Sequence, residues 1–287
     1  MLQAYFQRIG YTGPRLPDLA TLNGIIAAHV QTIPFENLDV LLGRPMSLEP
    51  EALLQKLVRQ RRGGYCFEQN GLLLEVLRML DFEVVPLSAR VRLQHTRDFT
   101  PPRTHMFLQV TIDGEPWLAD VGVGGLSPAA ALAMNSPLPQ ATPHELRRLL
   151  REGNLTFHQV ELGGDWQDVS EFTHEKMPRI DREVAHWFTA TSPASHFRNR
   201  LLVARAGPNG TRHTILNHEY SERAASGHAT KQRSHRPMSC FACSTKSLAW
   251  SSGPARSFPA RGLRGHRWFR RDLLRRSIKG PPLPRFL

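Results

Sequence analysis

Residues 59–71 read RQRRGGYCFEQNG, a stretch in which a glycine pair is followed closely by a cysteine. Apolar residues recur downstream at helical spacing, namely Leu72, Leu73, Val76, Leu77 and Leu80. This spacing predicts a helix over 66–80 with Cys66 in its first turn. The free N–H groups of a first helical turn carry partial positive charge and favour a thiolate over a thiol. Arg61 and Arg62 add positive charge nearby.

Two interpretations of Cys66 are open at this point. As a nucleophile, the cysteine would use the turn at Gly63-Gly64 for close approach of a ligand, and its own N–H could donate to an oxyanion. As an inert residue, it would be buried in the core, which is the usual fate of a lone cysteine. The chain has three cysteines, an odd number that does not support a disulfide framework of the secreted type. We therefore expect a free thiol in a reducing compartment.

The segments before this stretch predict two more helices. Apolar spacing indicates one over 16–33, with Pro17 near its start, and another over 50–60. Together with the helix over 66–80, they predict a helical bundle in residues 1–82.

Beyond the helices the pattern changes to alternating and β-branched residues separated by short turns. This pattern predicts a β-rich domain over 83–185. Residues 186–231 mix helical and strand signals around the turn Pro208-Asn209-Gly210, and we expect them to begin an α/β unit. The chain is therefore expected to have an α+β fold.

Positive charge is concentrated at the end of the chain. Residues 231–287 carry 14 Lys and Arg against one acidic residue, whereas residues 1–230 carry 23 against 24. Low complexity and lack of periodicity predict that residues 232–287 are disordered. They contain no base-reading motif, so nucleic acid is not an expected partner. The pair Cys240 and Cys243 lacks a second ligand pair at finger spacing, and no metal site is predicted.

No segment of the sequence predicts export or membrane insertion. The N-terminal residues lack a basic region followed by an apolar one, and no apolar run approaches the ~18 residues of a membrane span. We expect a cytoplasmic protein with no membrane partner.

A second informative stretch is residues 105–121, HMFLQVTIDGEPWLADV, which predict two antiparallel strands joined by a type I′ turn at Asp113-Gly114. In that register the numbers of facing residues sum to 227, so His105 faces Gly122. Asp120 then lies diagonally beside His105 on the same face, about 7–8 Å away between backbones. A carboxylate that holds one imidazole nitrogen leaves the other for a thiol. A surface histidine beside a capping aspartate would have the same pattern.

Five segments resemble, in order and spacing, the motifs of the bacterial arylamine N-acetyltransferase family: AYFQRIGY at 4–11, IPFENLD at 33–39, RRGGYCFEQN at 61–70, THMFLQVTIDG at 104–114 and WLADVGVGG at 117–125. The similarity runs from residue 1 to about residue 230. It implies a three-domain papain-like or transglutaminase-like fold, with a helical bundle, a β-barrel and an α/β lid around a cleft. It also implies that Cys66, His105 and Asp120 form a catalytic triad.

The activity implied by the resemblance is acetyl transfer by a ping-pong mechanism. The acetyl group would pass from acetyl-CoA to Cys66 and then to an arylamine, arylhydrazine or hydrazide. Acetyl-CoA would be a co-substrate, with no permanently bound cofactor and no metal. A papain-like thiol hydrolase and an inactive relic with a nucleic-acid-binding basic tail are the alternatives.

The resemblance also implies roles for residues around the triad. Phe35 would line the acceptor pocket, and an ion pair between Glu36 and Arg62 would brace the cysteine loop. Val123 and Gly124 would approach both the acceptor pocket and the pantetheine of CoA. Many family members have phenylalanine at the position of Val123, so we expect an enlarged or reshaped acceptor site here.

The similarity stops where the basic tail begins. The family would continue past Lys231 with the rest of the lid, whereas this chain changes abruptly in charge and composition. Our hypothesis is that residues 232–287 arise from a shifted reading frame or an equivalent replacement. The lid at 186–231 would then be incomplete, and strands within 200–217 would lose their partners.

Overall fold

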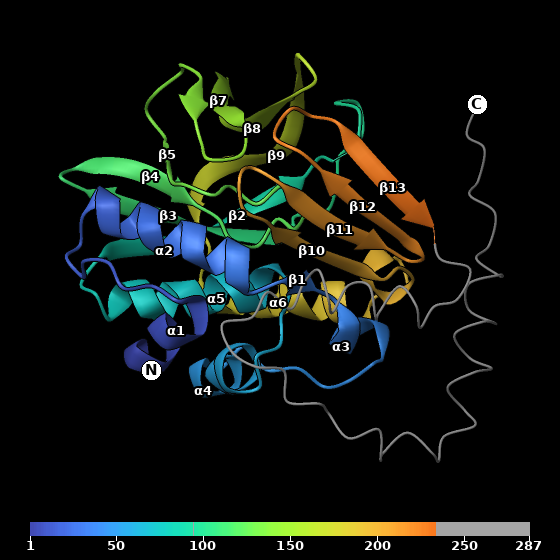
Figure 1. The fold of residues 1–287 in the computed structure, drawn as a ribbon, viewed down its shortest axis with the longest axis horizontal. Coiled ribbons are helices and arrows are strands. Elements are labelled where there is room, and N and C mark those ends of the chain that lie inside the picture. Colours follow the sequence, from blue (N-terminus) through green and yellow to red (C-terminus); the bar gives the residue numbers. More distant parts are fainter. Residues whose placement is uncertain (94, 234–287) are drawn as a thin grey trace.

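The computed structural model describes residues 1–93 and 95–233, and it shows an α+β fold in which helices pack beside two antiparallel sheets (Figure 1). The helices are α1 (Leu2–Ile9), α2 (Leu19–Thr32), α3 (Leu38–Leu41), α4 (Pro50–Leu53), the π-helical η1 (Leu54–Arg59), α5 (Cys66–Arg78), α6 (Arg179–Thr191) and the 3-10 turn η2 (His196–Arg198). None of the helices in this part of the chain has the length and apolar character needed to cross a bilayer.

Within the described residues, the strands form one sheet of eight and one of five. The eight-stranded sheet contains β2 (Glu83–Val91), β3 (His105–Ile112), β4 (Glu115–Ala119), β5 (Leu132–Ala133), β6 (Gln140–Ala141), β7 (Leu146–Glu152), β8 (Leu155–Leu162) and β9 (Asp165–Lys176). The five-stranded sheet contains β1 (Phe35–Glu36), β10 (Leu202–Ala206), β11 (Arg212–Leu216), β12 (Glu219–Arg223) and β13 (Ala229–Arg233).

The three predicted helices are present, with differences at their ends. The helix expected over 16–33 is α2, which begins at Leu19 because the Asp18 carboxylate accepts a hydrogen bond from the Thr21 N–H at 2.7 Å. Pro17 therefore lies before the cap and outside the first turn. The helix expected over 50–60 consists of α4 and η1, and the one expected over 66–80 is α5. Helix α1 was not predicted.

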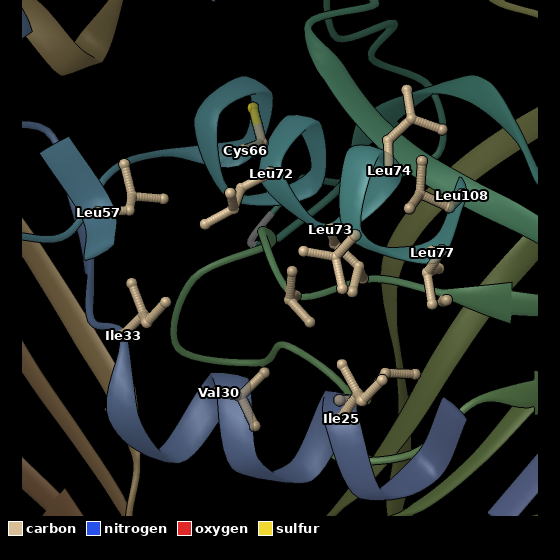
Figure 2. Packing of buried hydrophobic residues seen from close by; sticks show 14 of the residues in the cluster. Ile25, Val30, Ile33, Leu57, Cys66, Leu72, Leu73, Leu74, Leu77 and Leu108 are labelled. Carbon is tan, nitrogen blue, oxygen red and sulfur yellow. The ribbon is translucent and has the colours of Figure 1, made fainter. Parts of the chain in front are cut away.

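The main hydrophobic core lies between these helices and one face of the β3–β4 hairpin. Figure 2 shows Ile25 and Val30 of α2 facing the leucines of α5. One face of the hairpin contributes Met106, Leu108, Val110, Ile112, Ala119 and Val121. Phe107 and Leu118, from the other face, belong to a second cluster inside the eight-stranded sheet. The hairpin therefore separates two cores, as the alternation of its residues requires.

The hairpin has the predicted register. Leu108 pairs with Ala119 and Val110 pairs with Trp117, so the residue numbers sum to 227. Asp113 and Gly114 both have positive φ, +52° and +80°, as a type I′ turn demands.

The eight-stranded sheet curls into a nearly closed barrel in the order β5-β4-β3-β2-β9-β8-β7-β6. Its two edges are joined by a side chain. The amide of Gln140 on β6 accepts from the N–H of Ala133 on β5 at 2.7 Å and donates to the carbonyl O of the same residue at 3.0 Å. The Gln140 side chain thus supplies at the gap the pair of hydrogen bonds that a neighbouring strand would make.

The five-stranded sheet has the order β1-β10-β11-β12-β13, and β1 comes from the N-terminal part of the chain (Figure 1). Phe35 pairs with Ala204 and Glu36 with Val203. The expectation that strands within 200–217 lose their partners is therefore wrong, because β10 and β11 are each paired on both sides.

The domain division stays a prediction. Strand β2 begins at the expected boundary, Glu83, whereas α6 spans the boundary between residues 185 and 186, and β13 spans that between 231 and 232. The hypotheses on a disordered, frameshifted or nucleic-acid-binding tail concern residues that lie, from 234 onward, outside the described part of the chain.

A buried polar chain crosses the helical core. Gln69 Nε2 donates to the carbonyl O of Pro34 at 2.8 Å, so Gln69 Oε1 is free to accept from His29 Nε2 at 2.6 Å. His29 Nδ1 then accepts from the Tyr5 hydroxyl at 2.8 Å. The ring is fully buried, and its burial lowers the pKa of His29 to about 4. The core therefore holds this imidazole neutral.

This neutral histidine should make the fold sensitive to mild acid. In the unfolded chain, His29 takes up a proton below pH ~6.5. In the folded protein it takes one up only below about pH 4. The free energy of unfolding should fall as the pH drops through this window, with about 2 kcal/mol lost from this residue between pH 7 and pH 5. Urea unfolding at both pH values would measure it. His29→Gln should show a loss smaller by that amount, and equal losses in both proteins would refute the assignment.

Candidate active site

Cys66 is the first residue of α5, as the sequence predicts. Tyr65 is extended and caps the helix, and its N–H donates to Glu68 Oε2 at 3.1 Å. The glycine pair before it is required by packing. A Cβ on Gly63 would come within 2.1 Å of the Pro34 carbonyl O, and one on Gly64 within 2.7 Å of Glu68 Oε2. The two glycines thus let the cysteine loop lie against the chain near β1.

His105 and Asp120 lie side by side under the start of α5. His105 Nε2 donates to Asp120 Oδ2 at 2.7 Å, and both side chains are buried. Asp120 Oδ1 accepts from Asn70 Nδ2 at 2.9 Å and from the Gly122 N–H at 2.8 Å. Burial opposes ionisation of Asp120, but the charge of His105 and these hydrogen bonds outweigh it and lower the pKa of the carboxyl.

The electrostatics of this pair extend to the cysteine. Burial disfavours a charged His105 ring, but the Asp120 carboxylate and then the Cys66 side chain raise the pKa of His105 to about 10. Cys66 Sγ lies 3.6 Å from the carbonyl O of Thr104, the residue before His105. The structure thus brings the three predicted triad residues together, with His105 Nδ1 left for the thiol.

Asn70 joins the helix to the hairpin, and sequence reasoning missed it. Its Nδ2 donates to Asp120 Oδ1 and to the carbonyl O of Met106 at 2.7 Å, and its Oδ1 accepts from the Val121 N–H at 3.0 Å. Asn70 lies four residues after Cys66, on the same face of α5. That spacing was the available signal for a second polar residue facing the site.

The glycine-rich turn after Asp120 packs directly against the cysteine. A Cβ on Gly122 would come within 2.8 Å of Cys66 Cα, so no larger residue fits there. Gly124 has φ +88° and lies over Phe35 and Leu202, which a Cβ would meet at 3.7 Å. Val123 is 8% exposed and belongs to a small apolar cluster with barrel valines.

Aromatic rings gather beside the start of α5. Phe35 lies 6.0 Å from Phe197 between ring centroids, and Tyr65 meets Phe197 edge to face at 5.9 Å. The Tyr65 hydroxyl is hydrogen-bonded to His186 Nδ1 of α6. Phe197 comes from η2, more than 120 residues along the chain from Cys66, and no local pattern indicated its place.

The predicted ion pair between Glu36 and Arg62 is present, at 2.9 Å, and it belongs to a larger network. Arg62 also pairs with Asp39 at 2.9 Å. Lys56 bridges Asp39 at 2.8 Å and Glu68 at 2.6 Å. The cysteine loop is thus tied to β1 and α3, through Arg62 within the loop and through Lys56 of η1 before it. Over residues 1–93 and 95–233, no three His, Cys, Asp or Glu residues form a group that could hold a metal ion.

Comparison with known proteins gives consistent matches. A family model described as N-acetyltransferase matches residues 18–241. The chain is 46% identical over 207 residues to the arylamine N-acetyltransferase of Mycolicibacterium smegmatis, which covers 71% of this chain and 75% of that protein. It is 41% identical over 233 residues to the arylamine N-acetyltransferase of Escherichia coli, covering 81% and 82%.

Solved structures agree with these relatives. The arylamine N-acetyltransferase of M. tuberculosis superposes with a TM-score of 0.83 at 38% identity, covering 86% of this chain and 93% of that one. The Mycobacterium marinum arylamine N-acetyltransferase, solved in complex with CoA, gives a TM-score of 0.83 at 35% identity, covering 87% and 92%.

Asp120→Asn should make the Cys66 thiol less reactive. The variant keeps His105 buried but removes the charge that raises its pKa, so the ring becomes neutral at pH 7. A neutral ring supports a thiolate less well, and alkylation of Cys66 by iodoacetamide at pH 7 should slow about tenfold or more. Asp168→Asn, which removes a carboxylate paired with Arg97 instead, should react at the wild-type rate. Equal rates in all three proteins would contradict the coupling.

Arg62→Gln should destabilise the fold through the network around the cysteine loop. It leaves the buried Glu36 without its cation and removes one partner of Asp39, which should cost about 3 kcal/mol. Arg59→Gln is the matched control, because Arg59 pairs with Glu51 on the surface and should contribute less than about 1 kcal/mol. Urea unfolding measures both. Equally small losses of unfolding free energy in both variants would show that the ion pairs of Arg62 do not stabilise the cysteine loop.

Proposed function

The chain belongs to the arylamine N-acetyltransferase family, and from this premise we propose that Cys66, His105 and Asp120 carry the acetyl group through an acetyl-cysteine intermediate. The protein is an acyltransferase enzyme. The observation that most supports the proposed mechanism is the buried 2.7 Å hydrogen bond between His105 and Asp120, beside a thiol at the start of a helix.

In the first half-reaction the Cys66 sulfur attacks the thioester carbonyl carbon of acetyl-CoA, and His105 holds the thiol proton. A pKa of about 10 favours the protonated ring at neutral pH. The free N–H of Cys66, in the first turn of α5, can donate to the oxyanion of the tetrahedral intermediate. The carbon–sulfur bond to CoA then breaks, and CoA leaves with a proton from His105.

In the second half-reaction the acceptor amine attacks the acetyl carbonyl carbon on Cys66. His105 takes the proton that the amine loses, and Cys66 leaves as a thiolate. Asp120 holds the ring through Nε2 in both steps, so Nδ1 faces the reacting groups. No step needs a metal ion, because the amine is nucleophilic and the thioester is already activated.

The donor is proposed to be acetyl-CoA, which the family uses, and the M. marinum relative was solved with CoA. Gly124 and Val123 are proposed to lie near the pantetheine, since Gly122 of the same turn contacts Cys66. Arylamines are the acceptor class in the names of the relatives. We extend it to arylhydrazines and hydrazides, whose terminal nitrogens are comparable nucleophiles.

Phe35 is proposed as an aromatic wall of the acceptor pocket, because it lies over Gly124 and contacts Phe197. Val123 offers less bulk than an aromatic residue at that turn, so larger acceptors should be accepted. A cytoplasmic location is proposed because Cys66 is a free thiol that must stay reduced to act.

Acetyl-CoA alone should acetylate the protein once. Intact-mass measurement should show an increase of about 42 Da in wild type and none in Cys66→Ala, because the sulfur is the acyl carrier. Adding aniline should remove the added mass from the wild-type protein. A wild-type protein that gains no mass, or a Cys66→Ala variant that still gains it, would sink the mechanism. Loss of the acetyl group at the same rate without any amine would instead favour the thiol hydrolase.

A further inference from the structure

Asn37 stands where the pairing between β1 and β10 stops. Phe35 faces Ala204 and Glu36 faces Val203, so the register places Asn37 opposite Leu202. The backbone leaves the extended conformation at Asn37, with φ −117° and ψ 26°. The Asn37 side chain replaces the backbone as hydrogen-bond acceptor at this position, because its Oδ1 accepts from the Leu202 N–H at 2.8 Å.

The same side chain holds two more main-chain groups of the segment 197–202. Asn37 Nδ2 donates to the carbonyl O of Phe197 at 2.8 Å and to that of Arg200 at 2.7 Å. The Asn37 residue is 1% exposed, so water does not compete for these hydrogen bonds. One buried amide thus fixes the path of the chain from η2 into β10.

The segment that Asn37 fixes carries an aromatic ring to the active site. Phe197 contacts Phe35 and meets Tyr65 edge to face, at centroid separations of 6.0 and 5.9 Å. Tyr65 directly precedes Cys66. Asn37 therefore fixes the position of the Phe197 ring against Tyr65, the residue before Cys66, through main-chain contacts alone.

We propose that Asn37 is a positioning residue that holds Phe197 as a wall for the aromatic ring of the acceptor, and so sets the preference for arylamines over acceptors that lack a ring. The proposal rests on the proposed function. Asn37 acts only through the segment 197–202 and touches no reacting atom. Misplacement of a positioning group by about 1 Å can cost on the order of 100-fold in rate, and the effect here is confined to acceptors that use the ring.

The test compares two acceptors, aniline and hydrazine, on pre-formed acetyl-enzyme. In Asn37→Ser, kcat/KM for aniline should fall about tenfold or more, whereas that for hydrazine and the rate of acetylation by acetyl-CoA should each stay within about twofold. Phe197→Leu should lower the aniline-to-hydrazine ratio in the same way. The double variant should add little to either single one, because both act on the same ring.

Asn199→Ser is the matched control, because Asn199 Nδ2 donates to the carbonyl O atoms of Pro193 and Ser195, both at 3.3 Å, within the same connection. Its acceptor ratio should equal that of wild type. If Asn37→Ser does not fold, Asn37→Asp is the second variant: it keeps the acceptor for Leu202, but it replaces the two donor contacts with a carboxylate oxygen that the carbonyl O atoms of Phe197 and Arg200 repel. It should show the same selective loss.

Two results would overturn the proposal. Parallel losses with aniline and hydrazine in a folded Asn37 variant would mean that the residue is merely structural, and an unchanged ratio in Phe197→Leu would mean that the ring is no wall. Failure of wild type to form acetyl-enzyme would instead refute the proposed function itself, which the intact-mass measurement detects separately.

Discussion

One buried carboxylate organises this site. Asp120 has lost its water and must be satisfied by the protein, and the cost of leaving such a charge without partners is several kcal/mol. Its hydrogen bonds come from His105 on β3, from Asn70 on α5 and from the N–H of Gly122 in the glycine-rich turn. Helix, hairpin and turn can satisfy it only when all three are correctly placed. The position of Cys66 follows, since the thiol shares a helix with Asn70.

Local patterns in the sequence predicted the hairpin register and the place of Cys66 in this arrangement. The Asp113-Gly114 turn set the register of the hairpin, and the register alone put His105 beside Asp120. Helical spacing was sufficient to place Cys66 in the first turn of α5. Turn chemistry and periodicity act over a few residues, and the later packing of the chain did not override them.

Long-range contacts were not accessible in the same way. Nothing local to Phe197 or Asn37 indicates that they meet, because their contact depends on β1 joining β10 across more than 160 residues. The family resemblance supplied the Glu36–Arg62 pair, but not Asp39 or Lys56, which complete the network. The start of α2 differs from the predicted one for a local reason, because the Asp18 carboxylate caps the helix at the Thr21 N–H and leaves Pro17 outside the first turn.

The two-residue strand β1 has a consequence for how the chain is made. Synthesis releases Phe35 and Glu36 long before Leu202–Ala206, the strand with which they pair, leaves the ribosome. β1 therefore has no partner from β10 until all the residues of the barrel have been made. The ion pairs of Arg62 and Lys56 join residues within 36–68 only, so they can form before β10 is made and can stabilise β1 until then. β10 can then add to β1 with only the native register of two pairs to find, Phe35 with Ala204 and Glu36 with Val203.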